Sequence, residues 1–299
     1  TYPALLHDDA VRDAFAGPQD IYELDTRSIA EAADLLQCPV LVIAGWECQD
    51  LSSAGAGAGL RGGRSSSVFA LASILANLQK ALPDDSVGYF AENVPIHLNR
   101  KHERIRTEDS STVNALLGTP VTVDAARFGA YAHRLRSYWT NLAETKAVQD
   151  ACAHAHRDTT LALSDILHPS HQARTAANDT PQMFYPCNTA SQTLRVLPTL
   201  MATPSSYAFR NGGPGMLRNI QTDQLDEPCA LERERAMGYS DDATAAPNTG
   251  EAARRRLLGN AMDMRAISAL FAICERVSET ESVNPPPAVG AVHVDNATY

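Results

Sequence analysis

The segment PVLVIAG, Pro39–Gly45, is a short β-branched run closed by a glycine, a pattern typical of a strand buried in the middle of a sheet. The same reasoning predicts helices over 68–81 and 111–117 and further strands over 87–91, 121–123 and 135–139. Strands that alternate with helices form parallel sheets. The sequence therefore predicts an α/β fold with a doubly wound, mostly parallel sheet.

Beyond the predicted sheet the alternation ends and the composition changes. Residues 142–188 are rich in His, Pro, Asn and Thr, and 195–218 contain the turn sequence Asn-Gly-Gly-Pro. Near the C-terminus three prolines follow one another, which is typical of disorder. We therefore expect a core over 1–141, a small second lobe over 142–218, a return to the core over 219–277 and a disordered tail over 278–299.

The composition excludes several classes of protein. The 299 residues are 44% hydrophobic, which excludes a wholly disordered chain. Uninterrupted apolar runs fall short of the roughly 18 residues that cross a bilayer, so we expect no membrane-spanning segment. The N-terminus carries neither an initiator Met nor a secretory signal, so we expect part of a longer, intracellular protein. Six scattered cysteines without a C-x-x-C pair favour reduced thiols.

The net charge is 25 − 35 = −10 with histidine neutral, so any nucleic-acid-binding surface must be concentrated locally. One basic run meets this condition, with Arg100, Lys101, Arg104 and Arg106 directly after the strand over 87–91. Its position puts it at the rim of a site at the end of that strand. The alternative is an ordinary solvated loop.

Two groups with useful chemistry stand where a doubly wound sheet binds ligands, at the carboxyl ends of strands. Cys48 follows the first strand, and backbone donors there favour a nucleophilic thiolate; a buried small apolar residue is the alternative. Glu92 ends the next strand, and partial burial suits a carboxyl that carries a proton; an ordinary solvated acid is the alternative. Arg134 and Arg136 alternate along the predicted strand and so share one of its faces. The alternative to a role in the site is a structural salt bridge for either arginine.

Two other patterns in the sequence are typical of a cofactor site and of a metal site. Gly57–Gly62 fits G-x-G-x-x-G, the fingerprint of a nicotinamide cofactor site, but Gly57 stands 57 − 45 = 12 residues past the strand end, which favours a mobile loop. The histidines 154, 156, 168 and 171 have no cysteine pair or acid at the spacing of a tetrahedral set. We therefore predict surface histidines and no metal.

Cys48-Gln49, Glu92–Val94 and the pair Arg134 and Arg136 follow one another along the chain. In this order they resemble motifs of the DNA cytosine-5 methyltransferases, most closely of the de novo type that some retroelements carry. The family's nucleophile loop reads Pro-Cys followed by Gln or Asn, and this chain has Glu47-Cys48-Gln49. The Glu-Asn-Val signature is complete at Glu92–Val94. Four further stretches match: an Asp before Thr-Arg-Ser-Ile (25–29), paired arginines before an aromatic pair and Asn (133–141), a Glu-Arg and Gly-aromatic helix (231–239) and the last cofactor motif (254–260).

The resemblance implies methyl transfer from S-adenosyl-L-methionine (SAM) to carbon 5 of a cytosine flipped out of DNA. Cys48 would attack carbon 6 while protonated Glu92 binds ring nitrogen 3. Arg136 would hold the exocyclic oxygen, and Arg134 would position the neighbouring backbone.

The resemblance also implies binding partners. SAM would contact Asp25 and Thr26 on one side and Asn260, Ala261 and Met262 on the other. The lobe over 142–218 would be the target-recognition lobe, and the basic run would meet DNA phosphates. A nuclear enzyme, or an intracellular one in a prokaryote, is expected, and both homo- and hetero-oligomers are compatible with it.

Two features depart from the family. The Phe-x-Gly-x-Gly motif and the ribose-binding acid are absent before Asp25, so we expect the first cofactor-binding strand to be missing from this chain. Glu47 replaces the Pro before the nucleophile. Both departures favour the rival hypothesis, a degenerate, non-catalytic methyltransferase-like protein that binds DNA or a partner.

Overall fold

A four-stranded sheet forms the centre of the protein in a computed structural model, which describes residues 20–155, 161–174, 196–204, 206–210 and 212–283. Its strands are β1 (Val40–Gly45), β2 (Val87–Asn93), β3 (Val121–Asp124) and β4 (Leu135–Thr140), in the order β1-β2-β4-β3. β1 is parallel to β2, and β4 is antiparallel to both β2 and β3. Three of these four strands run the same way, which confirms the predicted mostly parallel sheet.

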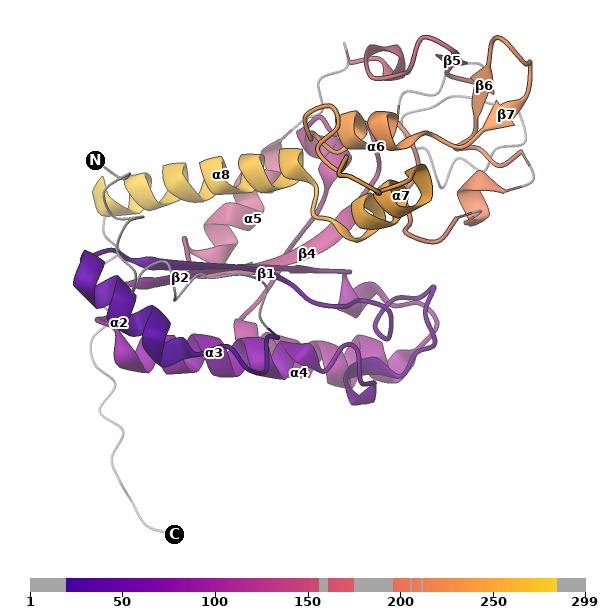
Figure 1. The fold of residues 1–299 in the computed structure, drawn as a ribbon. Helices are drawn as coiled ribbons and strands as arrows, with labels where there is room; N and C mark the ends of the chain where they lie inside the picture. The colour runs from indigo at the N-terminus through magenta and orange to yellow at the C-terminus, as the bar shows by residue number, and fades with distance from the viewer. Residues whose placement is uncertain (1–19, 156–160, 175–195, 205, 211, 284–299) are drawn as a thin grey trace, which may run out of the picture.

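Helices cover both faces of the sheet (Figure 1). One face carries α2 (Thr26–Leu36), α3 (Ser67–Ala81) and α4 (Ser110–Leu117), and the other carries α5 (Thr145–His154) and α8 (Met264–Val283). The central strand β2 packs against helices on both faces of the sheet, because successive side chains of a strand point to opposite sides. Phe90 stacks on Phe271 of α8, with ring centroids 4.7 Å apart, while Ala91 packs in the cluster that includes Leu71 of α3. The result is a three-layer α/β/α core.

A smaller lobe lies beside the carboxyl ends of β1 and β2. It contains α6 (Ala230–Ala236), α7 (Glu251–Asn260) and a three-stranded antiparallel sheet, β5 (His171–Gln172), β6 (Leu217–Asn219) and β7 (Leu225–Asp226). The buried Arg233 ties it together, pairing with Glu227 at 2.8 Å and donating to the carbonyls of Pro228 and Met201. His171, which we predicted to lie on the surface, is instead held by the buried Glu232 at 2.7 Å.

The structure moves three of the predicted boundaries. α5 follows residue 142, yet its Val148 and Cys152 pack against β3 and α8, so this helix belongs with the core. β7 pairs with β6 in the lobe, which extends the lobe past residue 218. The predicted tail over 278–299 starts too early, because α8 continues to Val283; residues 284–299 lie outside the described part of the chain.

One stretch, Glu251–Glu279, is long and apolar enough to cross a membrane by length and composition alone. In the structure it comprises two helices, α7 and most of α8, which are interrupted at residues 261–263. α8 buries Ala266, Leu270 and Ile273 against the sheet. Its apolar character is therefore explained by its position as a core helix.

Candidate active site

The two predicted reactive groups meet at the carboxyl ends of adjacent parallel strands. In the β1–β2 register Gly45 is opposite Glu92, so the loop that leaves β1 passes directly over the end of β2. Cys48, Glu92, Arg134 and Arg136 all line one cavity of about 410 Å³, a size within the usual range for ligand pockets. The structure therefore brings together the four side chains that we predicted to be catalytic.

Glu92 and Arg136 form an ion pair at the base of this cavity, with Arg136 Nε 2.7 Å from Glu92 Oε1. The strands β2 and β4 position them, and about a tenth of each side chain is exposed. A second contact, from Arg136 Nη1 to the carbonyl of Leu135, fixes the guanidinium. A carboxylate and a guanidinium side by side offer a ligand one acceptor and several donors.

Arg134 directly precedes β4 and lines the same cavity as Arg136, but it has a different set of contacts. It is 4% exposed, and its guanidinium donates to the carbonyls of Gly259 and Ala261 at the end of α7. Burial lowers the pKa of Arg134 to about 10. Arg134 therefore holds the α7–α8 corner against the sheet, so that this corner forms one wall of the cavity.

The segment 46–65, which we call the Cys48 loop, is held by hydrogen bonds to its main chain. Asn93 Nδ2 donates to the carbonyl of Trp46 at 2.9 Å, and Asn99 Nδ2 donates to the carbonyl of Leu51 at 2.8 Å. Ser65 Oγ donates to the carbonyl of Glu47 at 2.7 Å. This last contact constrains the loop at the position where the family has a proline.

The predicted cofactor residues fall into two groups. Asn260 and Met262 line the cavity beside Cys48, and Ala261 contributes its carbonyl to Arg134. Asp25 and Thr26 begin α2 and do not line the cavity. The Asp25 carboxylate instead caps its own helix, accepting from Ser28 Oγ and from the backbone N–H groups of Arg27 and Ser28, which lowers its pKa.

Two buried polar side chains near this site were missed in the sequence. Asp263 is completely buried at the start of α8, where its Oδ1 accepts from the backbone of Ala266. Burial raises the pKa of Asp263 to about 6 and also raises that of Tyr138 in β4. Helix capping by Asp263 is a local signal that could have been recognised from its place before Met264, whereas its burial could not.

The alternative motifs do not form ligand sites in the part of the chain that the structure describes. Gly59, inside the G-x-G-x-x-G match, faces the ion pair of Asp109 and Arg104, so side chains of the protein itself occupy the space beside it. Among the described residues no group of His, Cys, Asp and Glu is arranged to hold a metal ion. We predicted that Arg104 of the basic run contacts phosphates, but in the structure its guanidinium pairs with Asp109 at 2.7 Å.

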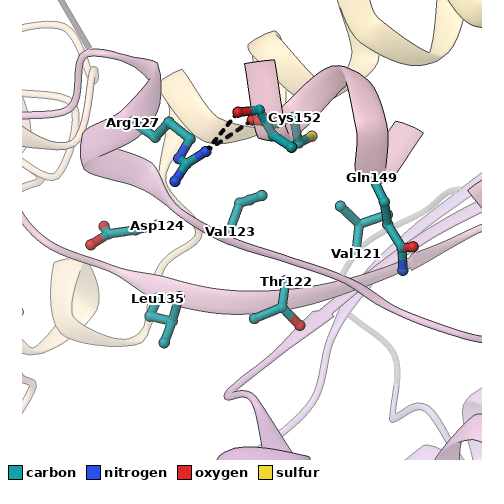
Figure 2. Close-up of a pocket in the computed structure, with 9 residues that line it drawn as sticks. Val121, Thr122, Val123, Asp124, Arg127, Leu135, Gln149 and Cys152 are labelled. Atoms are coloured by element: carbon teal, nitrogen blue, oxygen red, sulfur yellow. Dashed lines mark hydrogen bonds between the residues drawn. The ribbon is translucent and has the colours of Figure 1, made fainter. Parts of the chain in front are cut away.

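A second cavity, of about 280 Å³, is lined by residues of β3 and α5 (Figure 2). Its polar side chains are engaged with the protein itself: Arg127 donates to the carbonyls of Cys152 and Ala153, Gln149 donates to the carbonyl of Pro120, and Asp124 pairs with His133 at 2.7 Å. The Arg127 contacts satisfy carbonyls at the end of α5. This cavity is consistent with a structural role.

Comparisons with known proteins agree with the geometry of the fold. No protein-family model matches the chain. The Dnmt2 methyltransferase of S. pombe is 17% identical, with a TM-score of 0.54 over 90% of this chain and 85% of that one. The Entamoeba histolytica methyltransferase EhMeth is 12% identical, with a TM-score of 0.54 over 90% of this chain and 86% of that one. The chain therefore has the fold of the Dnmt2-type methyltransferases.

Proposed function

We propose that the protein is a methyltransferase that acts on carbon 5 of cytosine in DNA, with Cys48 as its nucleophile. The observation that carries the proposal is the single cavity shared by Cys48, Glu92 and Arg136 at the ends of two parallel strands. A nucleophile, a proton carrier and a donor for an oxygen are the groups that this chemistry requires. Since DNA is the substrate, we also propose a nuclear location, or an intracellular one in a prokaryote.

Cys48 begins the reaction. Its thiolate attacks carbon 6 of the base, the ring electrons move toward carbon 5, and carbon 5 becomes nucleophilic. After carbon 5 has been methylated, its proton passes to a base from the solvent and the carbon–sulfur bond breaks, which restores the thiolate. Ring nitrogen 3 returns its proton to Glu92, which leaves the neutral aromatic base. Glu47, which stands beside Cys48, is exposed and lines the same cavity.

Glu92 and Arg136 orient the base. Glu92 takes up a proton and donates it to ring nitrogen 3, which draws electrons from carbon 5 and carbon 6. Arg136, already placed by its contact with the carbonyl of Leu135, donates to the exocyclic oxygen. The ion pair that the two side chains form in the structure must open when the base enters.

SAM fits one wall of the cavity. The Asn260 amide can hydrogen-bond the polar part of the cofactor, while Met262 supplies apolar contact. Met262 packs directly against Gly45, because a Cβ at Gly45 would lie 3.0 Å from Met262 Cε. When bound, SAM supplies the methyl group. We propose Asn260, Ala261 and Met262 as its binding residues; Asp25 and Thr26 remain candidates for the opposite side.

Trapping tests the assignment. DNA that carries 5-fluorocytosine should form a covalent adduct with the full protein in the presence of SAM, because fluorine cannot leave as the proton does. We expect Cys48→Ser to abolish the adduct and Cys38→Ser, a change at an exposed thiol outside the cavity, to preserve it. Adduct formation by Cys48→Ser would refute the role of Cys48.

The same assay identifies the substrate and tests the rival hypothesis. RNA of the same sequence should form no adduct if DNA is the substrate. If neither nucleic acid is trapped or methylated but DNA still binds, the non-catalytic binding protein is the better description.

A further inference from the structure

We propose that Asp109 and Arg104 form a latch that sets the conformation of the Cys48 loop, which makes Asp109 a positioning residue for Cys48. The proposal rests on the proposed function for the role of Cys48 in catalysis. Asp109 is 5% exposed and lies before α4, at the end of the π-helical turn Ile105–Asp109. Such turns occur frequently at functional sites.

The latch holds the loop from two sides. Asp109 Oδ1 pairs with Arg104 Nη1 at 2.7 Å, and Asp109 Oδ2 accepts from the backbone N–H of Leu60 at 3.2 Å. Arg104 Nη2 then donates to the carbonyl of Ala58 at 2.8 Å. One ion pair therefore satisfies both a donor and an acceptor of the loop backbone, and charged partners make these hydrogen bonds stronger than neutral ones.

Gly59, between those two residues, fits closely against the latch. Its φ is +66°, and a Cβ added to it would lie 2.0 Å from Asp109 Oδ2 and 2.5 Å from Arg104 Nη2. Only glycine adopts this backbone conformation without strain and leaves room for the carboxylate. The contact between loop and latch therefore depends on the residue at position 59.

The loop transmits the position of the latch to the thiol. Gly59 N–H donates to the carbonyl of Asp50 at 2.9 Å, and the N–H groups of Leu51 and Ser52 donate to the carbonyl of Cys48 at 3.0 and 2.8 Å. Asp109 and Cys48 are thus connected through hydrogen bonds of neighbouring loop residues. Because Ile105 and Val113, on either side of Asp109, are fully buried, the latch is anchored in the core and its hydrogen bonds fix the backbone of the loop.

Thiol reactivity tests the latch independently of methyl transfer. The full protein is treated with iodoacetamide, and alkylation of Cys48 is measured by mass spectrometry relative to the exposed Cys38. We expect Asp109→Ala to raise this ratio at least about threefold, because a released loop opens more often. The matched control is Glu108→Gln, a neighbouring exposed acid whose contact with Arg61 is 3.8 Å long; it should leave the ratio unchanged.

Arg104→Ala, and the double variant with Asp109→Ala, show whether the pair acts as a unit. We expect each to match Asp109→Ala, because residues in one hydrogen-bond network have non-additive effects. If Asp109→Ala fails to fold, Gly59→Ala tests the same contact from the loop side and should also raise the ratio. An unchanged Cys48 ratio in folded Asp109→Ala, or in Gly59→Ala, overturns the proposal.

Steady-state kinetics separate positioning from a general structural role. We expect Asp109→Ala to lower kcat by on the order of tenfold to a hundredfold, the cost of a misplaced reacting group, with KM for DNA unchanged. An equal loss in Glu108→Gln, or a change in KM alone, contradicts positioning of Cys48. If the unaltered protein transfers no methyl group while the alkylation ratios change as expected, the proposed function fails and the latch stands.

Discussion

Single residues near the candidate site are charged groups removed from water. Burial lowers the pKa of Arg134 to about 10 and raises that of Asp263 to about 6. Both shifts have the same physical cause, because a low-dielectric surrounding disfavours the charged form of each group. Burying these charged residues therefore lowers the stability of the fold. Hydrogen bonds such as those from Arg134 to the carbonyls of Gly259 and Ala261 partly offset this loss.

Asp263 makes this cost measurable. Its pKa is raised from 3.8 to about 6 in the folded chain, so the folded chain binds the proton more tightly than the unfolded chain does. The contribution of this group to stability therefore falls as pH rises between those two values. We expect Asp263→Asn, which keeps a capping acceptor, to be more stable than the parent at pH 7.5 by about 1–3 kcal/mol.

The advantage of Asp263→Asn should shrink as pH is lowered from 7.5 to 4, where the parent carboxyl is protonated in the fold. Urea denaturation of both proteins at the two pH values measures it. A constant difference between them would show that Asp263 does not titrate in this range.

Elements of the core and the lobe meet at the end of α7. Gly259 lies against the backbone of the segment that precedes α6: a Cβ there would be 2.1 Å from Ala202 N and 2.4 Å from Ala202 Cα. Arg134 of the sheet binds the carbonyl of the same glycine. The corner between α7 and α8 is therefore held on two sides, and its Asn260 and Met262 face the cavity.

Gly259→Ala should disturb this corner. The added methyl group meets backbone atoms, which cannot rotate away, so we expect a loss of about 1–3 kcal/mol in the free energy of unfolding. Gly250→Ala is the control, because nothing lies within 4 Å of a Cβ at that position. Thermal unfolding of both variants measures the effect; equal midpoints would mean that the corner yields.

The whole molecule carries a net charge of −10, so the DNA binding that the proposed function requires must rely on a few local cations. Arg100 and Lys101 are exposed and follow the site directly in sequence, whereas Arg104 is held by Asp109. The association of the protein with DNA should therefore depend strongly on salt, through a small number of contacts.

Replacing Arg100 and Lys101 with Gln should reduce the slope of log affinity against log salt by about 1.8, at roughly 0.9 per phosphate contact. Arg27→Gln on α2, whose side chain is 87% exposed, should leave the slope unchanged. Fluorescence anisotropy with labelled DNA at several salt concentrations measures it. If the slope does not change in the double variant, the phosphate contacts are made by the lobe and not by Arg100 and Lys101.

Local patterns determined the elements of this protein. The strand predicted over 39–45 is β1 at Val40–Gly45, and the helix predicted over 68–81 is α3 at Ser67–Ala81, because periodicity depends on neighbours in sequence. The period of two predicted one shared face for Arg134 and Arg136, and both side chains line the cavity. The order of Cys48, Glu92 and the two arginines along the chain carried a resemblance whose implied fold the structure confirms.

Tertiary structure alone decided which partner each side chain meets. The antiparallel β4 lies between β2 and β3, and this order depends on connections between distant segments, which no local pattern encodes. Arg134 binds carbonyls more than a hundred residues away in sequence, and Arg104 turns to Asp109 and Ala58 rather than to solvent. Hydrogen bonds and ion pairs of this kind are set by distances in the folded chain, which is why residue types could predict the chemistry of the site but not its supports.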